Sequence, residues 1–233
     1  MLTPAKLFLL GKSVDKEHKM LNKYTYFANE YNAPHYRIID IGTLVHEGVK
    51  IKEDLPEYVH KFIGIQGELL MIANIVEKHI PMLQLRSIRG DKTFSVFGSQ
   101  TKCFYGLGMI PNTFKYGDWL IVCEGIMDTD VGRCLGVPAI GMMTSNLTSM
   151  QLEILKLLTN KVILCYDNDK AGRIGYKKDS KRLREQGFTV KCLIQYEDLK
   201  DMGDLMQLKY EGNEFDFKVA FQYYHNMINQ LIR

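Results

Sequence analysis

The sequence predicts an α/β fold, in which a mostly parallel sheet with helices on both faces follows a smaller mixed α+β part. From Asp118 onward, apolar strand-like runs alternate with helical segments, as in sheets whose strands are joined by helices. These runs are continuously apolar, which is typical of strands covered on both faces. The earlier residues lack this regularity. We therefore expect an N-terminal basic subdomain over 1–117, a parallel-sheet domain over 118–208 and a C-terminal helix over 209–233.

The N-terminal part mixes helices and strands. A helix is expected over 16–31, a strand over 37–41, and a longer helix from Pro56, a favourable first-turn residue, toward Lys78. Two short strands, MLQLRSI and TFSVFG, are joined by the turn RGDK and predict a hairpin.

In the second part, predicted strands and helices alternate regularly along the chain. Strands are expected at WLIVCE, VPAIG, KVILCYD and TVKCLIQ, with helices between them. The first helix should end at Gly136, and the third should run over 171–186 and end at Gly187. The middle helix offers Thr148 as N-cap and Gln151 as its capping-box partner.

Composition excludes several classes of protein. The apolar run in the starting segment MLTPAKLFLLGK is too short for a secretory signal. The sequence also has no run of about 18 apolar residues, so no membrane span is predicted. We expect a cytoplasmic protein, in the host cytoplasm if it is phage-encoded, with no membrane partner. The five cysteines form no C-x-x-C pair and the histidines have no ligand spacing, so no zinc is expected.

Acidic residues end two of the apolar strands. Glu124 closes the first, and Asp167 and Asp169 close and follow the third. Ligand sites of parallel sheets lie beyond the carboxyl ends of their strands, so these acids converge if the two strands are neighbours. A hard divalent cation, Mg²⁺ or Mn²⁺, would offset their repulsion, and Gly125 and Gly172 would let the backbone turn tightly beside it. A single strand-end acid is, by contrast, more often a helix N-cap or a solvated turn residue.

The two acidic segments together resemble a known domain. E-G-x-x-D, followed about 40 residues later by D-x-D-x-x-G, is similar to the Toprim domain that DnaG-type primases, topoisomerases and some nucleases share. The strongest similarity is to the catalytic core of phage and bacterial primases. It is carried by YGLG at 105–108, CYDNDKAGR at 165–173 and LKDMGDLM at 199–206, and it covers about residues 80–208.

The resemblance implies a role for each acid. Glu124 would be the acid–base carboxylate, and Asp167 and Asp169 the principal Mg²⁺ ligands. The remaining acids would extend the cluster toward a second ion; they are Asp128, Asp201 and Asp204. Two ions could clamp the attacking and leaving oxygens of a phosphoryl transfer, as in joining a ribonucleotide to a primer with release of pyrophosphate.

The resemblance also implies basic residues that hold phosphates. Those of the hairpin region would bind nucleotide and template, and Lys170 and Arg173 lie close behind the acids; the hairpin set is Arg86, Arg89, Lys92 and Lys102. The family's arginine after Phe-Gly is replaced here by Ser99 and Gln100. Basic residues near a hairpin are otherwise often only solvated.

The leading interpretation is a DNA-dependent RNA primase core that makes short primers on single-stranded DNA from ribonucleoside triphosphates. The alternatives are a metal-dependent Toprim nuclease and a non-catalytic replication accessory protein. A replicative helicase and a separate zinc-bearing template-recognition protein are the further partners that the resemblance implies, since full primases carry such modules.

Overall fold

The structure is a computed structural model that describes residues 36–40, 68–76, 79–87, 93–97, 104–196, 199–205, 208 and 213–233. The chain divides into two compact units, Met1–Ser99 and Gln100–Arg233. Residues 104–117 therefore lie with the second unit, whereas the sequence grouped them with the first. Tyr105 pairs with Gly141 through N–H···O bonds of 2.9 and 3.0 Å, and Phe104 is fully buried in the core of this unit.

The first unit contains an antiparallel sheet in the order β1-β2-β3-β4. Its strands are β1 (Tyr36–Asp40), β2 (Glu68–Val76), β3 (His79–Ser87) and β4 (Thr93–Phe97). The predicted strand at 37–41 and the predicted hairpin strands are confirmed. The helix predicted from Pro56 to Lys78 is wrong over 68–76, which form β2.

The reason for this difference is tertiary. β2 is hydrogen-bonded to β1 on one side and to β3 on the other, and this pairing overrides the helix propensity of its Leu, Met and Ala residues. The predicted helix over 16–31, the segment 56–67 and the RGDK turn lie outside the described residues.

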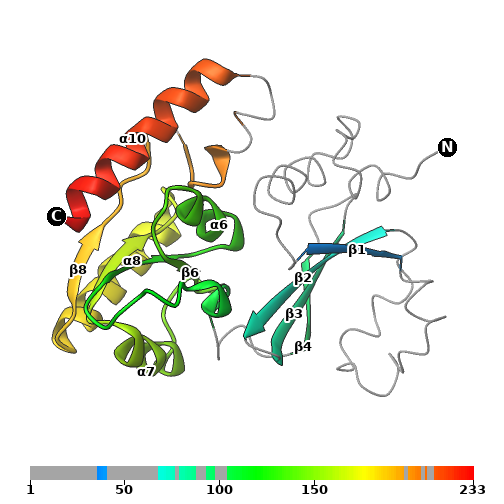
Figure 1. Ribbon diagram of the computed structural model, residues 1–233, viewed down its shortest axis with the longest axis horizontal. Coiled ribbons are helices and arrows are strands. Elements are labelled where there is room, and N and C mark those ends of the chain that lie inside the picture. The colour runs from blue at the N-terminus through cyan, green and yellow to red at the C-terminus, as the bar shows by residue number, and fades with distance from the viewer. Residues whose placement is uncertain are drawn as a thin grey trace. The chain divides into compact units, whose positions relative to one another are not determined.

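The second unit is built on a parallel sheet in the order β6-β5-β7-β8, so the predicted strand–helix alternation is confirmed (Figure 1). A 3₁₀ turn, η2 (Leu107–Met109), precedes it. The strands and helices follow in chain order as β5 (Trp119–Cys123), α6 (Ile126–Cys134), β6 (Ala139–Gly141), α7 (Ser149–Leu158), β7 (Lys161–Cys165), α8 (Lys170–Glu185), β8 (Thr189–Cys192) and α10 (Glu214–Ile232).

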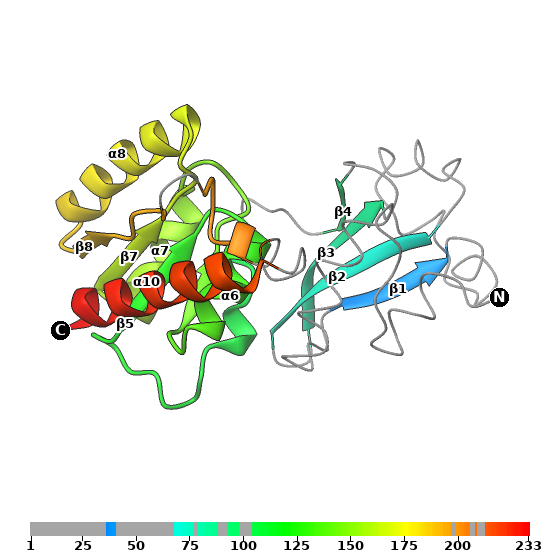
Figure 2. The ribbon, with the colours of Figure 1, turned by 90° about the horizontal axis from the view of Figure 1, so that it is seen from above.

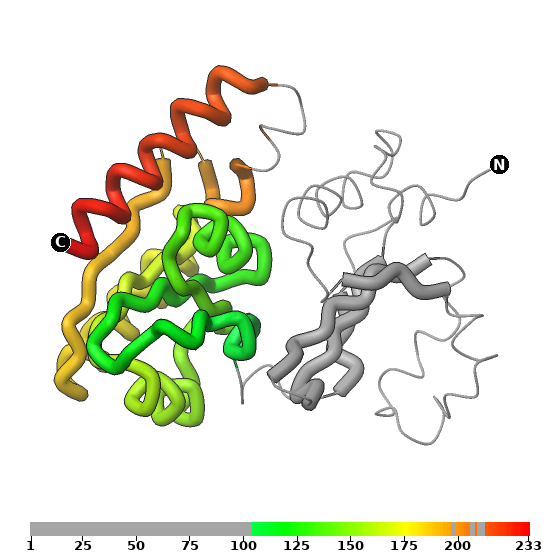
Figure 3. The backbone as a smooth tube through the Cα atoms, viewed as in Figure 1, coloured from blue at the N-terminus to red at the C-terminus, as the bar shows by residue number. Residues whose placement is uncertain are grey.

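Helices cover both faces of this sheet. Leu155 of α7 and Leu183 of α8 belong to one buried cluster with alternate residues of β5 and β7, so α7 and α8 lie on the same face. Figure 2 shows α10 on the face of the sheet opposite α8. Figure 3 traces the backbone of these elements in the view of Figure 1. The Tyr224 hydroxyl of α10 donates to Gln195 Oε1 at 2.7 Å. The C-terminal helix thus packs on the sheet unit.

The helix ends follow local sequence signals. Thr148 and Gln151 form the predicted capping box at the start of α7. Gly136 and Gly187 end α6 and α8 in the left-handed region, with φ of 82° and 86°, which glycine adopts without strain. In the ranges that the structure describes, no helix is long and apolar enough to cross a membrane.

Candidate active site

The acids that end β5 and β7 lie at one edge of the parallel sheet. The two strands are direct neighbours, with Cys123 opposite Cys165 in register. Glu124 is the first residue after β5, Asp167 is the second after β7, and Asp169 follows at the start of α8. The condition on which the sequence-based site depended, that these strands be adjacent, is therefore met.

Asp169 has two roles in this position. It is the N-cap of α8, where its Oδ1 accepts a hydrogen bond from the Gly172 N–H at 2.8 Å. This bond, followed by the attraction of Lys200, lowers the pKa of the Asp169 carboxyl. Its side chain remains 44% exposed, so the other carboxylate oxygen is accessible to a ligand. The capping role, which was the alternative to a metal ligand, therefore coexists with an accessible carboxylate.

Glu124 is half-buried, and its Oε2 lies away from solvent without a hydrogen-bond partner. Burial away from water raises the pKa of the Glu124 carboxyl, and the nearby Asp167 carboxylate raises it further. The Asp167 backbone and Lys200 act in the opposite direction, but the net pKa is raised. A strand-end carboxyl that holds its proton more readily than usual is suited to acid–base chemistry.

Lys200 is a site residue that the sequence analysis did not single out. Its Nζ lies 2.7 Å from Asp167 Oδ2 and 3.9 Å from Asp169 Oδ2. The hydrogen bond to Asp167 raises the pKa of the Lys200 amine. The signal was present in the sequence, because Lys200 opens the acidic segment after β8. Its contact with the acids depends on how that segment folds back.

The other three acids of the predicted cluster hold this segment in place. Asp128 Oδ1 accepts from the Gly203 N–H at 3.1 Å, which ties α6 to residues 199–205. Asp204 Oδ2 accepts from the Lys200 N–H at 2.9 Å, and the Asp204 N–H donates to Asp201 Oδ1 at 3.0 Å. These contacts place the three carboxylates around the acidic edge as supports of its backbone.

The carboxylates at this edge are suitable donors for a metal ion, although they do not form a complete coordination site. Within the part of the chain that the structure describes, no three Asp, Glu, His or Cys side chains lie close enough together to hold an ion. The edge nevertheless attracts positive charge, since Asp167 and Asp169 already lie beside the Lys200 ammonium and the buried Glu124 Oε2 has no partner. Carboxylate oxygens at a water-accessible edge are the ligands that Mg²⁺ prefers.

Gly172 explains the glycine of the D-x-D-x-x-G pattern. A Cβ at this position would lie 2.1 Å from the Asp167 carbonyl oxygen, so only glycine lets the first turn of α8 approach the end of β7 this closely. Gly125 is extended, with φ of −112°, and a Cβ there would meet Asp128 Oδ2 at 2.9 Å. Both glycines thus serve close approach beside the acids, and Gly125 also lies in the bend that joins β5 to α6.

Three of the six basic residues proposed to bind phosphates lie within the described part of the chain. Arg173 Nη1 donates to Asn168 Oδ1 at 3.1 Å, and both Arg173 and Lys170 are exposed at the start of α8. Arg86 lies on β3, where it is paired with Leu70 and Thr93. The others lie outside the described residues, namely Arg89, Lys92 and Lys102.

A groove of about 330 Å³ opens beside Asp167. It runs between the first turns of α8 and the chain that follows β8, and Arg173, Tyr176 and Ile194 contribute to its lining. Ile194 is 63% exposed. The groove therefore offers an apolar surface with a cation directly next to the acidic edge.

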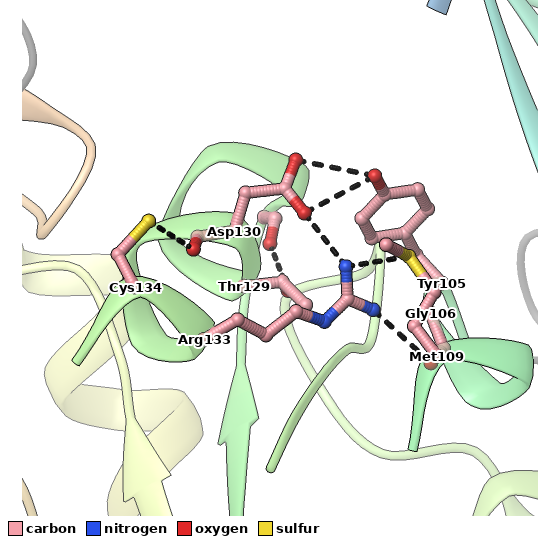
Figure 4. A network of polar contacts seen from close by, with 8 residues as sticks. Tyr105, Gly106, Met109, Thr129, Asp130, Arg133 and Cys134 are labelled. Atoms are coloured by element: carbon pink, nitrogen blue, oxygen red, sulfur yellow. Dashed lines mark hydrogen bonds and ion pairs between the residues drawn. The ribbon is translucent and has the colours of Figure 1, made fainter. Parts of the chain in front are cut away.

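A buried polar network, which the sequence analysis missed, links the YGLG segment to α6 (Figure 4). The Tyr105 hydroxyl donates to the Asp130 carboxylate at 3.1 and 3.2 Å, and Arg133 Nη1 donates to Asp130 Oδ1 at 2.9 Å. Arg133 Nη2 also donates to the Gly106 carbonyl at 3.1 Å. Gly106 has φ of 84°, and a Cβ there would lie 1.9 Å from Arg133 Nη2. Tyr105 and Gly106 thus pack against Asp130 and Arg133 of α6 and hydrogen-bond to them.

A second missed contact fixes the end of β7. The hydroxyl of Tyr166, which directly precedes Asp167, donates to the fully buried Asp179 of α8 at 2.5 Å. Asp179 also accepts from the Leu147 N–H at 2.7 Å. An acid inside a basic helix gives no sequence signal of this role, because only the packing of α8 shows that its face is buried.

Comparison with known proteins finds similarity over the part of the chain that contains this acidic edge. Residues 121–206 match a family model described as Toprim-like. A DNA primase of Clostridium acetobutylicum is 32% identical over 104 residues, which are 44% of this chain and 17% of the relative. A DNA primase of Campylobacter jejuni is 28% identical over 120 residues, covering 50% and 18% of the two chains. The matches thus span less than a fifth of each curated relative.

Solved structures show the same fold. A DnaG primase catalytic domain bound to single-stranded DNA matches with a TM-score of 0.56 at 16% identity, covering 89% of this chain and 83% of that one. A Pseudomonas aeruginosa DNA primase domain gives 0.57 at 18% identity, covering 89% and 75%. Aquifex aeolicus primase gives 0.60 at 16% identity, covering 94% and 62%. The chain carries a Toprim-like domain over 121–206, and its fold resembles that of the catalytic core of DnaG primases.

Proposed function

We propose that this chain is the core of a DNA-dependent RNA primase, which synthesises short RNA primers on single-stranded DNA by metal-dependent nucleotidyl transfer. The observation that carries the proposal is that Glu124, Asp167 and Asp169 follow two neighbouring strands at one edge of a Toprim-like domain. The curated relatives of this part of the chain are DNA primases, which favours priming over the cleavage reactions that other Toprim proteins perform.

Three residues would hold the catalytic ion. Asp167 and Asp169 offer carboxylate oxygens that already lie beside the Lys200 ammonium, and Glu124 offers a buried oxygen without a hydrogen-bond partner. A bound Mg²⁺ or Mn²⁺ would supply positive charge to the phosphate oxygens that become more negative during transfer. The supporting acids would orient the site and, with a second ion, extend it; they are Asp128, Asp201 and Asp204.

Glu124 would move the proton. A carboxylate oxygen of Glu124, which is only partly buried at the end of β5, would accept the proton of the 3′-hydroxyl of a growing primer. Because burial and Asp167 raise the pKa of this carboxyl, the ionised form takes a proton more readily than an ordinary glutamate does. The proton released when the hydroxyl attacks the incoming nucleotide would pass to this oxygen.

Basic residues would hold the substrates. Lys170 and Arg173 lie exposed next to Asp169 and would contact nucleotide phosphates, and the residues of the hairpin region would contact template and nucleotide; these are Arg86, Arg89, Lys92 and Lys102. Phosphate binding by Lys and Arg weakens steeply with salt. Arg86→Ala should therefore lower both the affinity for single-stranded DNA and its dependence on salt, whereas Lys181→Ala on the solvated face of α8 should change neither.

The proposed partners follow from the resemblance to primases that the sequence shows. Single-stranded DNA would be the template and ribonucleoside triphosphates the substrates. A replicative helicase, and a separate protein with a zinc-bearing template-recognition module, would complete the priming apparatus.

The decisive experiment incubates the protein with single-stranded DNA, labelled ribonucleotides and Mg²⁺ or Mn²⁺. Short RNA products are expected, and both Glu124→Gln and Asp167→Asn should abolish them. Glu153→Gln, which alters an exposed carboxylate on α7, is the matched control and should keep full activity. Shortened DNA without RNA would identify a nuclease, and no change in either nucleic acid would refute the catalytic assignment.

A further inference from the structure

The positive charge at the acidic edge comes from the protein itself. Lys200 Nζ lies 2.7 Å from Asp167 Oδ2 and 3.9 Å from Asp169 Oδ2, between the two carboxylates proposed as principal metal ligands. An ammonium and a divalent cation cannot both occupy the position that faces these oxygens, because like charges so close repel strongly. This competition presupposes the metal site of the proposed function.

The backbone holds Lys200 at this position independently of its side chain. The Asn168 N–H donates to the Lys200 carbonyl oxygen at 2.6 Å, which joins the segment 199–205 to the loop between Asp167 and Asp169. The Lys200 N–H donates to Asp204 Oδ2 at 2.9 Å, and Asp128 anchors Gly203 from α6. A change of the Lys200 side chain therefore leaves these attachments intact.

The side chain itself can leave the acids. It is 57% exposed, whereas the Asp167 carboxylate is only 15% exposed. The ammonium is a compact charge on a flexible stem, so it can move into water while the carboxylates stay fixed by the ends of β7 and α8.

We propose that the Lys200 ammonium is an internal counter-ion that competes with the divalent cation for Asp167 and Asp169. In the metal-free protein it offsets the repulsion between these acids and Glu124 and keeps the edge assembled. Metal binding displaces it, so the affinity for metal is set lower than the carboxylates alone would give. Lys200 is in this sense a positioning residue for the metal site.

The test compares Mn²⁺ binding to variants of this chain, with free Mn²⁺ measured by electron paramagnetic resonance. Lys200→Met, which keeps the length and removes the charge, should bind Mn²⁺ roughly tenfold more tightly than the unaltered chain, since the pair is partly screened by solvent. Lys200→Arg keeps the charge and should bind no more tightly. Lys178→Met removes the same charge from an exposed position on α8 and should agree with the unaltered chain within about twofold.

A second measurement follows thermal unfolding in a metal chelator and in saturating Mn²⁺. Lys200→Met should unfold at a lower temperature in chelator and gain more from Mn²⁺ than the unaltered chain gains. Unchanged or weaker Mn²⁺ binding by Lys200→Met, or no Mn²⁺ binding by any variant, would overturn the inference. Primer synthesis is scored separately: tighter binding by Lys200→Met in a protein that makes no primers would leave the inference standing and remove the proposed function.

Discussion

Gly172 offers the sharpest test of how the active-site edge is built. It is the third residue of α8, where replacement of a glycine by alanine ordinarily stabilises an exposed helix by about 1 kcal/mol. In this helix a Cβ would lie 2.1 Å from the Asp167 carbonyl oxygen, and 2.9 and 3.0 Å from the Asp167 C and N atoms. These are backbone atoms, so no side-chain rotation can relieve the overlap.

The magnitude follows from the movement that Gly172→Ala requires. Carbon–oxygen contacts ordinarily begin near ~3.3 Å, so the start of α8 must shift by roughly 1 Å. That shift strains the packed start of the helix, at about 1–3 kcal/mol, and weakens the Asp169 cap, at about 1 kcal/mol. We therefore expect Gly172→Ala to lower the free energy of unfolding by about 2–4 kcal/mol, opposite in sign to the helix-propensity effect.

Urea unfolding followed by tryptophan fluorescence measures this change, because Trp119 in β5 is the protein's single tryptophan and reports on the parallel-sheet unit. Gly136→Ala is the matched control. A Cβ at Gly136 meets nothing within 4 Å, but its φ is 82°, so that variant carries only backbone strain of about 1 kcal/mol. If Gly172→Ala proves as stable as the unaltered chain, or more stable than Gly136→Ala, the close approach of α8 to Asp167 is refuted.

Three other outcomes are expected. Because the pKa of Glu124 is raised in the folded protein, this carboxyl stabilises the fold below the ordinary glutamate pKa, and the stabilisation is lost as the pH rises through the folded-state pKa. Glu124→Gln should therefore raise the metal-free Tm at neutral pH and lose that advantage in acid. An equal gain in Tm in acid would contradict this. Asp169→Ala should lower the free energy of unfolding by about 1 kcal/mol because α8 loses its cap, although removal of a clustered charge alone would raise it. Asp169→Asn keeps the cap, and calorimetry can compare the two variants. Arg133→Met removes the counter-charge of buried Asp130 and should lower the free energy of urea unfolding by about 3 kcal/mol, against less than about 0.5 kcal/mol for Lys181→Met in an exposed pair; equal losses would show that the buried network carries no special energy.

The sequence by itself determined the parallel-sheet unit and the acids that end its strands. Continuous apolar runs alternating with helices leave few folds other than a doubly covered parallel sheet. The cap at Thr148 and the ends at Gly136 and Gly187 were predictable for the same reason, because each depends on residues within a turn or two. The positions of Glu124 and Asp167 at strand ends were predictable because each acid directly follows an apolar run.

The tertiary structure decided what depends on distant partners. The sequence could place Glu124 beside Asp167 only on the condition that β5 and β7 are neighbours, and strand order is set by pairing across the whole sheet. β2 was mistaken for a helix because its two hydrogen-bonded neighbours outweigh its local propensity. Lys200 reaches the acids only because the segment after β8 folds back onto Asn168, a contact across 32 residues of chain that no local pattern encodes.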